Sequence, residues 1–198
     1  MSRSSAQRKP IILASNSPRR RALLAQIGLC FSTDPSHVDE RIIAGETPED
    51  HAVRLARDKA LVAAGHSGQS IIIAADTVVV LDNAVLGKPV DRNDAIRMLT
   101  LLSGNVHRVI TGLCVMDADT RKSMQRTATT KVWFRRLSAE EINAYADSGE
   151  SLDKAGSYGI QGKGALLVDR IEGCYFNVVG LPLSILGECL EAYGVPLW

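Results

Sequence analysis

The sequence has no excess of charge of either sign, few aromatic residues and no long apolar run. Its 198 residues carry 23 Lys and Arg against 22 Asp and Glu, a formal net charge of +1. Without a basic excess, the chain is not expected to bind a nucleic-acid polymer. Without an apolar run of about 20 residues, it is not expected to cross a membrane as a helix. The composition leaves room for a small anionic partner held by a few local cations.

Cysteine is scarce, and the four cysteines have no spacing typical of metal ligands or redox pairs. They are Cys30, Cys114, Cys174 and Cys189. Scattered thiols are typical of a reducing compartment, so we expect reduced, mostly buried cysteines in a cytoplasmic protein. Residues 1–10 are polar and basic and lack the apolar core of a secretion signal, which predicts a flexible N-terminus.

Helix and strand patterns alternate through residues 11–198, and no repeat or linker marks a domain boundary. This alternation predicts a single α/β domain with a mixed, twisted sheet, flanking helices and two lobes around a cleft. The predicted strands are 11–13, 29–33, 70–75, 78–81, 84–86, 106–116, 124–134 and 165–171. The predicted helices are 18–27, 48–64, 91–102, 138–147 and 181–193, with a turn at 177–182 before the last one.

Residues 11–21, with the sequence IILASNSPRRR, predict a strand that runs directly into a helix. Ser15 and Ser17 are helix-capping residue types, and Pro18 suits the first helical position. The free N–H groups and positive dipole end of such a helix favour an anion, and residues 19–21 add three arginines whose forks match phosphate. We interpret the segment as a phosphate-binding turn. The alternative is an ordinary capped helix with solvated arginines.

Lys59 is the only charge on an apolar face of the helix that begins near Pro48. The rest of that face contains Ala52, Leu55, Ala56, Val62 and Ala63. A lysine at the edge of such a face can extend its amine to solvent. The alternative is a lysine that reaches into a cleft to meet phosphate, because a buried ammonium requires a partner.

Asp76 follows an isoleucine-rich strand, and ligands of α/β proteins collect at the carboxyl ends of strands. A carboxylate there can take a proton from water or help to hold Mg²⁺. The alternative is an aspartate that starts a turn. Glu40, in a polar loop, is a weaker candidate for a second carboxylate, and Lys88 lies on a tight loop close to Asp76 in the sequence.

Residues 153–164 contain four glycines, which allow a backbone to approach a ligand closely. The spacing is not that of a dinucleotide-binding loop. Gln161 has a carboxamide that can read a base edge, and Tyr158 has a ring that can stack on a base. The alternative is a flexible glycine-rich loop. His107 has no metal-ligand partner at a suitable spacing, so we expect a structural histidine.

Nine collinear stretches resemble the Maf family of nucleoside triphosphate pyrophosphatases. They are SNSPRR at 15–20, VDE at 38–40, ARDKA at 56–60, AADTVVV at 74–80, GKP at 87–89, LSG at 102–104, TG at 111–112, DKAGSYGIQG at 153–162 and NVVGLPL at 177–183. The resemblance implies a Maf/ITPase-like domain with two lobes around a substrate cleft. It also implies hydrolysis of a nucleoside triphosphate to the monophosphate and pyrophosphate, a divalent cation (Mg²⁺ or Mn²⁺) and a homodimer.

The resemblance also implies roles for individual residues. The proton acceptor of the family falls on Asp76. The specificity positions fall on Arg19, Thr77 and Gln161, where the dTTP/UTP subfamily carries the same three residue types. This points to dTTP and UTP, or modified pyrimidine triphosphates. The alternatives are a pyrophosphatase for 7-methyl-GTP or another purine triphosphate, and a non-catalytic nucleotide-binding regulator of cell division.

Two further groups complete the predicted site. We expect the triphosphate to be held by Ser15, Ser17, Arg20, Lys59 and Lys88, together with N–H groups at 17–20. We expect the metal to be held by Asp76 and Glu40. These residues come from three well-separated parts of the chain, so the hypothesis requires the fold to bring them together around one polyanion.

Overall fold

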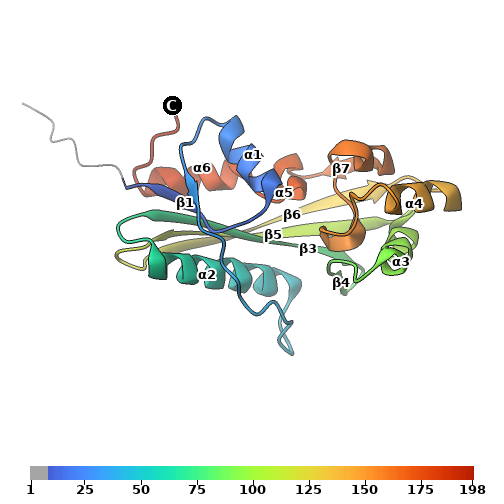
Figure 1. Ribbon diagram of the computed structural model, residues 1–198, viewed down its shortest axis with the longest axis horizontal. Helices are drawn as coiled ribbons and strands as arrows, with labels where there is room; N and C mark the ends of the chain where they lie inside the picture. Colours follow the sequence, from blue (N-terminus) through green and yellow to red (C-terminus); the bar gives the residue numbers. More distant parts are fainter. Residues whose placement is uncertain (1–8) are drawn as a thin grey trace, which may run out of the picture.

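The computed structural model describes residues 9–198, in which helices cover both faces of one mixed sheet (Figure 1). The strands are β1 (Ile11–Leu13), β2 (Ser32–Thr33), β3 (Ile71–Leu81), β4 (Ala84–Leu86), β5 (Val106–Asp117), β6 (Ser123–Phe134) and β7 (Val168–Glu172). The α-helices are α1 (Pro18–Gln26), α2 (Pro48–His66), α3 (Arg92–Leu102), α4 (Ala139–Ala146), α5 (Tyr175–Val179) and α6 (Leu183–Ala192). Two 3₁₀ helices are η1 (Ala155–Ser157) and η2 (Gly162–Leu167). The predicted α/β class, with a mixed sheet and flanking helices, is confirmed.

The sheet has a gap along one edge of β3. The strand order is β2-β1-β3-β5-β6-β7, and β4 also pairs with β3. On the edge of β3 opposite β5, β1 pairs parallel with residues 71–73 and β4 pairs antiparallel with residues 79–81. Among the described residues, no strand pairs with the stretch between them on this edge. Residues 74–78 of β3 therefore border an opening in the sheet.

Side chains of β3 alternate between the two layers of helices, as strand geometry requires. Ile71 and Ile73 point into a core formed with α1, α5 and α6, whereas Ile72 and Ala74 point into a core formed with α2. Figure 1 shows these layers, with α1, α5 and α6 above the sheet and α2 below it. Because of the same alternation, residues 76 and 77 face opposite layers of helices.

Helix α2 packs on the sheet through small residues. A Cβ atom added at Gly112 of β5 would lie 2.2 Å from the main-chain oxygen of Ala52, so the helix and the strand touch backbone to backbone. The predicted apolar face is right except at Val62, which is 38% exposed, while Ala60 and Ala64 are buried instead. Close packing of this kind leaves little freedom in the position of α2.

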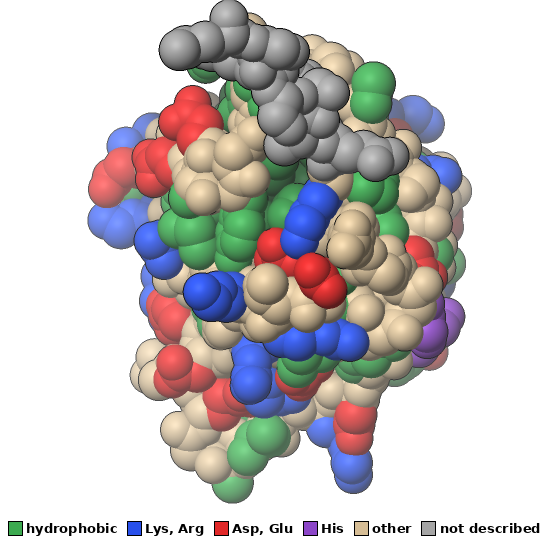
Figure 2. Space-filling model, turned by 90° about the vertical axis from the view of Figure 1, so that its left-hand side faces the viewer, with side chains coloured by type: hydrophobic (Ala, Val, Ile, Leu, Met, Phe, Trp, Pro, Cys, Tyr) green, Lys and Arg blue, Asp and Glu red, His purple; other side chains and the backbone are tan. Residues whose placement is uncertain are grey.

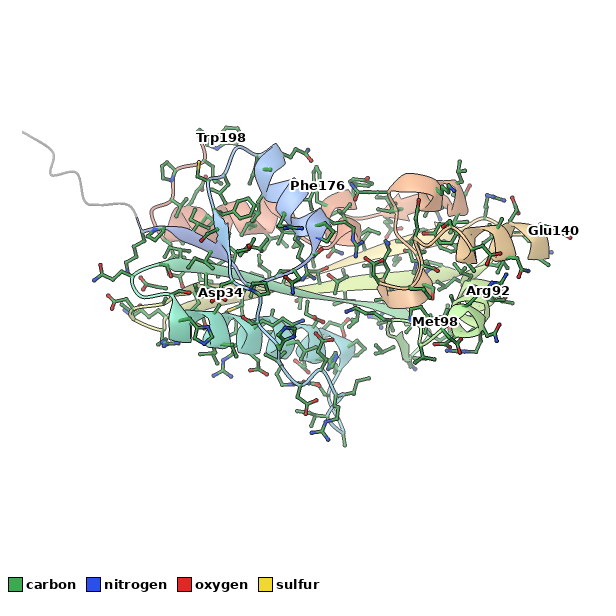
Figure 3. All side chains as sticks on the ribbon, in the orientation of Figure 1. Asp34, Arg92, Met98, Glu140, Phe176 and Trp198 are labelled. Atoms are coloured by element: carbon green, nitrogen blue, oxygen red, sulfur yellow. The ribbon has the colours of Figure 1, made fainter. Side chains whose placement is uncertain are left out.

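A second core lies at the other end of the long strands, on the same face of the sheet as the first. It joins α3, α4 and η1 to Val79 of β3 and Val109 of β5. Met98 of α3 belongs to this core, and Phe176 of α5 packs against the first one; Figure 3 shows the two residues well apart along the sheet.

Four predicted elements differ from the structure. The strand predicted to end before Asp76 instead continues, so β3 is a single strand over residues 71–81. The turn predicted at 177–182 is instead partly helical, because helix α5 covers Tyr175–Val179 and ends at Gly180, which has a φ of 119°. The strand predicted at 165–171 is a 3₁₀ helix followed by β7, and the strand predicted at 29–33 is reduced to β2.

The chain end and the surface agree with the balanced composition. The expected flexible N-terminus falls mostly on residues 1–8, which lie outside the described residues. Lys9 is held by Asp117, with Nζ and Oδ2 2.7 Å apart. Figure 2 shows acidic and basic side chains interspersed on this end of the molecule, among apolar ones. All four cysteines are free; two of them, Cys114 and Cys189, are buried. Across residues 9–198, no helix is both long enough and apolar enough to span a bilayer.

Candidate functional site

A cavity of about 540 Å³ opens at the gap in the edge of β3. Its walls come from both helix layers, the loop that follows β2, the loop after β4 and the glycine-rich segment near residue 160. The cavity is lined by all ten predicted site residues: Ser15, Ser17, Arg19, Arg20, Glu40, Lys59, Asp76, Thr77, Lys88 and Gln161. The fold therefore brings together the segments that the hypothesis required to meet.

Lys59 bridges two carboxylates on the α2 side of the cavity. Its Nζ lies 2.6 Å from Oδ1 of Asp76 and 2.7 Å from Oε1 of Glu40. The side chains of Lys59 and Asp76 are only 11% and 12% exposed, so the alternative of a lysine extended to solvent is wrong. A buried ammonium beside carboxylates is stabilised by opposite charge, and each carboxylate is stabilised in return.

Asp76 owes its position to the interior of a strand. The expected place was the carboxyl end of a strand, and that expectation is wrong, as is the alternative of a turn-starting aspartate, because β3 continues for five residues beyond Asp76. The gap in the sheet edge opens the strand to the cavity at this point. A carboxylate can therefore stand in mid-strand, where Lys59 compensates its charge.

Glu40 is delivered by the loop between β2 and α2, which passes from one helix layer to the other (Figure 1). Partial burial raises the pKa of Glu40, but the hydrogen bond from Lys59 and the charges of Lys59, Lys88 and Arg20 outweigh it and hold the pKa below its usual value. The carboxylate is thus ionised at neutral pH and adds negative charge to the cavity beside Asp76.

A second carboxylate fixes that loop to α2. Glu46 accepts hydrogen bonds from Arg54, with Nε at 2.6 Å from Oε1 and Nη2 at 2.9 Å from Oε2. His51 Nδ1 lies 3.1 Å from Oε2, and the N–H of Ile43 donates to the same oxygen. The hydrogen bonds from Arg54, opposed by burial and assisted by His51, lower the pKa of Glu46 to about 2. Sequence reasoning did not identify this group; an acid at the start of a helix gave no separate signal.

Arg20 and Thr77 meet on the opposite face of β3. Nη2 of Arg20 donates to Thr77 Oγ1 at 3.1 Å, Nη1 donates to Ser15 Oγ at 3.3 Å, and Nε donates to the carbonyl of Gly180 at 2.8 Å. Behind Thr77 lies Thr111, with the two Oγ1 atoms 2.9 Å apart. A guanidinium has five N–H donors, so two remain for a ligand in the cavity.

The start of α1 borders the cavity, but part of its predicted anion-binding capacity is already used. Ser17 caps the helix and accepts from the N–H of Arg20 at 3.4 Å, while the N–H of Ser17 donates to Ser15 Oγ at 3.1 Å. The prediction that these two N–H groups are free to bind phosphate is therefore wrong. The two serine hydroxyls hold the turn and the Arg20 side chain in place. The positive charge at the start of α1 therefore comes mainly from Arg20 and less from the N–H groups of the helix.

Arg19 and Gln161 both line the cavity. Arg19 Nη1 pairs with Asp153 Oδ2 at 3.0 Å, and the Asp153 side chain is 57% exposed. The side chains of Gln161 and Lys88 are exposed. Asp153 was not singled out from the sequence, although it opens the glycine-rich segment. Its pairing with Arg19 connects that segment to the start of α1.

Tyr158 is a core residue and not a ring available for stacking. It is 5% exposed, and its hydroxyl lies 2.7 Å from Nε2 of His107. Its ring packs edge-on against Phe134, with centroids 4.6 Å apart. The expectation that Tyr158 stacks on a base is wrong, because its hydrogen bond and its packing hold the side chain inside the second core. Burial lowers the pKa of His107 to about 4, so a neutral structural histidine, as predicted, occupies this place.

The carboxylates of the cavity fit a divalent cation only with help from a ligand. Asp76 and Glu40 each bond Lys59 Nζ through one oxygen, so the second oxygen of each carboxylate can contribute to a metal site. Within residues 9–198, no group of three or more His, Cys, Asp or Glu residues could hold a metal. Mg²⁺ is commonly bound by one or two carboxylates plus phosphates of a substrate, which is the arrangement that this pair allows.

Comparison with known proteins gives concordant matches. A family profile described as "Maf-like protein" matches residues 10–193. A protein from Syntrophomonas wolfei subsp. wolfei named dTTP/UTP pyrophosphatase is 51% identical over 172 residues, which span 87% of this chain and 91% of that protein. A protein of the same name from Clostridioides difficile is 48% identical over 183 residues, which span 92% and 94% of the two chains.

One solved structure shows a distant likeness. It is described as a HAM1 protein from Coxiella burnetii, with a TM-score of 0.45 and 18% identity over 65% of this chain and 74% of that chain.

Proposed function

This chain belongs to the Maf family, and on that premise we propose that it is a nucleoside triphosphate pyrophosphatase that hydrolyses dTTP and UTP to the monophosphate and pyrophosphate. One observation supports this proposal above the others. Carboxylates, lysines, arginines and polar side chains suited to a base line a single cavity, although they come from distant parts of the chain. A polyanion with a polar ring at one end matches such a cavity.

The cations of the cavity would neutralise the triphosphate. Arg20 has two unused N–H donors, Lys59 has one after its two carboxylate bonds, and Lys88 is an exposed residue of the cavity lining. Ser15 and Ser17 hold Arg20 and the turn that carries it. Phosphoryl transfer depends mainly on positioning and on stabilisation of charge, which are the tasks that these side chains can perform.

The base would be read by a second group of side chains that line the cavity. Thr77 offers a hydroxyl, Gln161 offers a carboxamide and Arg19 offers a guanidinium. Hydrogen-bonding groups of this kind reject a base whose edge lacks the matching partner, because a polar group then stays unpaired. We expect these residues to separate dTTP and UTP from purine triphosphates such as 7-methyl-GTP.

A divalent cation, Mg²⁺ or Mn²⁺, would be held by Asp76 and Glu40 together with phosphate oxygens of the substrate, and it would supply further neutralisation of charge. Asp76 orients a water molecule or takes its proton. The water oxygen forms a bond to the α-phosphorus as the bond from the α-phosphorus to the bridging oxygen breaks, and pyrophosphate leaves. Lys59 holds one oxygen of Asp76 in place throughout.

The test is pyrophosphate release from a panel of substrates: dTTP, UTP, CTP, GTP and 7-methyl-GTP, each with and without Mg²⁺ or Mn²⁺. We expect dTTP and UTP to be hydrolysed fastest and chelation of the metal to stop turnover. Equal rates for all bases would contradict the assigned base readers. Release of inorganic phosphate in place of pyrophosphate would contradict attack at the α-phosphorus.

We further propose that the protein acts in the cytoplasm as a homodimer. The four free cysteines fit a reducing compartment. The homodimer is what the resemblance to the Maf family implies. Light scattering coupled to size-exclusion chromatography tests the assembly, and a monomer mass across the micromolar range would contradict it.

A further inference from the structure

Thr77 lies at the cavity end of a line of hydrogen bonds that crosses from β3 to β5 and then reaches α5. Arg20 Nη2 is 3.1 Å from Thr77 Oγ1, which is 2.9 Å from Thr111 Oγ1. Thr111 Oγ1 is in turn 3.2 Å from the main-chain oxygen of Asn177. Thr111 and Asn177 are 0% exposed. Each hydrogen at the inner end of the line must therefore go to a protein acceptor.

The two ends of the line fix its direction. A guanidinium only donates, and a main-chain carbonyl only accepts. When Thr111 gives its one hydrogen to the carbonyl of Asn177, its oxygen can accept the hydrogen of Thr77, and all three bonds are made. In the reverse direction Thr111 donates to Thr77, and the buried bond to Asn177 is lost. The carbonyl of Asn177 also accepts from the N–H of Gly180 and is paired in either direction, but the first direction makes one more hydrogen bond within the protein and is therefore favoured.

The direction decides what Thr77 offers to a ligand. A threonine hydroxyl has one hydrogen and two lone pairs. Thr111 takes the hydrogen and Arg20 takes one lone pair. One lone pair remains on the cavity side. Thr77 therefore presents an acceptor to the cavity and no donor.

We propose that Thr111 is a positioning residue for base selection: by holding the hydrogen of Thr77, it makes Thr77 select a base with a ring N–H. This inference rests on the proposed function of the cavity as a pyrimidine nucleotide site. In a nucleotide, uracil and thymine each have a single N–H donor, at N3. Cytosine has a lone pair at N3, and its donor is the exocyclic amino group. An acceptor on Thr77 matches the first two bases and opposes the third.

The count of hydrogen bonds sets the size of the effect. Accepting from an N3–H adds one bond to the line. Donating to the N3 lone pair of cytosine requires Thr77 to release Thr111, so the number of bonds does not rise. A difference of one net hydrogen bond corresponds to a selectivity of about tenfold.

The experiment compares Thr111→Val with Thr111→Ser. Valine keeps the shape of the side chain but cannot accept the hydrogen of Thr77, whereas serine can. For each variant, kcat/KM for UTP and CTP is measured with metal, and Kd for both nucleotides is measured by calorimetry with EDTA. We expect Thr111→Val to lower the UTP-to-CTP ratio about tenfold and Thr111→Ser to retain it. Thr127→Val, on the exposed face of β6, serves as the matched control.

Each outcome bears on one proposal. An unchanged ratio in a folded Thr111→Val variant overturns the role of Thr111 and leaves the pyrophosphatase assignment intact. Absence of turnover of any triphosphate by the natural protein overturns that assignment, and the Kd ratios then test Thr111 by themselves.

If Thr111→Val does not fold, the natural protein supplies the test. N3-methyl-UTP lacks the donor, and 5-methyl-UTP carries the same added bulk with the donor intact. We expect N3-methyl-UTP to bind at least about tenfold more weakly than 5-methyl-UTP. Equal Kd values for the two nucleotides overturn the inference.

Discussion

Asp76 and Thr77 are neighbours in the sequence, yet they face opposite layers of the molecule and differ in the way each is held. Asp76 faces α2 and is fixed by opposite charge, through Lys59. Thr77 faces α1 and α5 and is fixed by a line of hydrogen bonds with Arg20 and Thr111. Both are open to the same cavity because one edge of β3, the edge opposite β5, has no strand partner there within residues 9–198.

The two faces of β3 therefore serve two different tasks. Charge on the α2 face is suited to a reaction at phosphorus, where charge develops and a proton moves. Oriented dipoles on the other face are suited to discrimination between bases, where the direction of a hydrogen decides the match. The period of two in a strand separates the tasks without separating the residues. Variants on each face should therefore change different observables.

The largest effect is expected from Asp76→Asn, which removes the charge on the α2 face and leaves the Thr77 face intact. Turnover should fall at least about a thousandfold, roughly 4 kcal/mol, because no carboxylate remains to orient water or take its proton. Nucleotide affinity should stay within about tenfold. Pyrophosphate release and calorimetric Kd values measure the two quantities. Full activity would remove Asp76 from the mechanism.

Gly112→Ala should loosen the α2 face as a whole. The new methyl would meet the carbonyl of Ala52, which cannot move without displacing α2. We expect the free energy of unfolding in urea to fall by about 3 kcal/mol. Because Lys59 lies on α2, activity should fall as well, while the UTP-to-CTP ratio should not change. Gly65→Ala is the control, since that glycine has open space at its Cβ position. Equal stability of the two variants would contradict the tight contact.

Thr77→Val should have the converse effect to Asp76→Asn. It removes the acceptor on the base-reading face and leaves Asp76, Glu40 and Lys59 in place. We expect kcat/KM for UTP to fall about tenfold and the rate with CTP to change little, so that selectivity is lost while chemistry remains. Thr77→Ser keeps the hydroxyl and should restore selectivity. A parallel loss of turnover for both substrates would contradict the division between the two faces.

Glu46→Gln tests how firmly the loop with Glu40 is attached to α2. The pKa of Glu46 is about 2 in the folded protein, against a usual value of 4.5. Its ionised form therefore stabilises the fold above about pH 4.5, and this stabilisation is lost as pH falls toward 2. The variant should be less stable at neutral pH by about 1 kcal/mol and should show a weaker pH dependence between these values. Urea unfolding at several pH values measures both. Identical pH profiles would exclude the role of Glu46.

The smallest effect is expected from Asp153→Asn. The pair with Arg19 is largely exposed on the aspartate side, and exposed pairs contribute less than about 1 kcal/mol. Thermal stability should hardly change. KM for UTP should change modestly, because Arg19 loses its anchor at the cavity opening, and high salt should mask this change. A large loss of kcat would instead place Asp153 in the chemistry.

Much of the fold could be predicted from the sequence because its signals are local. Thr47 and Ser138 cap helices as predicted, since a short polar side chain can satisfy a free N–H at the start of a helix. The long strand β5 follows from its apolar run, and β6 follows from the alternation that puts Ala128, Thr130, Val132 and Phe134 on one face. Helix α5 could not be predicted in this way, because it has only five residues. Its last carbonyls are capped by the N–H of Gly180.

Local sequence patterns are enough to identify the residues that have the chemistry of the site: a lysine on an apolar helix face, an aspartate in an isoleucine-rich run and arginines at a helix start. Their geometry depends on the folded chain. The edge of β3 opens at Asp76 because β1 ends early and β4 begins late, and strand pairing across distant segments has no local signal. The positions of Tyr158 in the core and of Thr111 beside Thr77 have the same cause. Packing and hydrogen-bond partners depend on residues that are close in space and distant in the sequence.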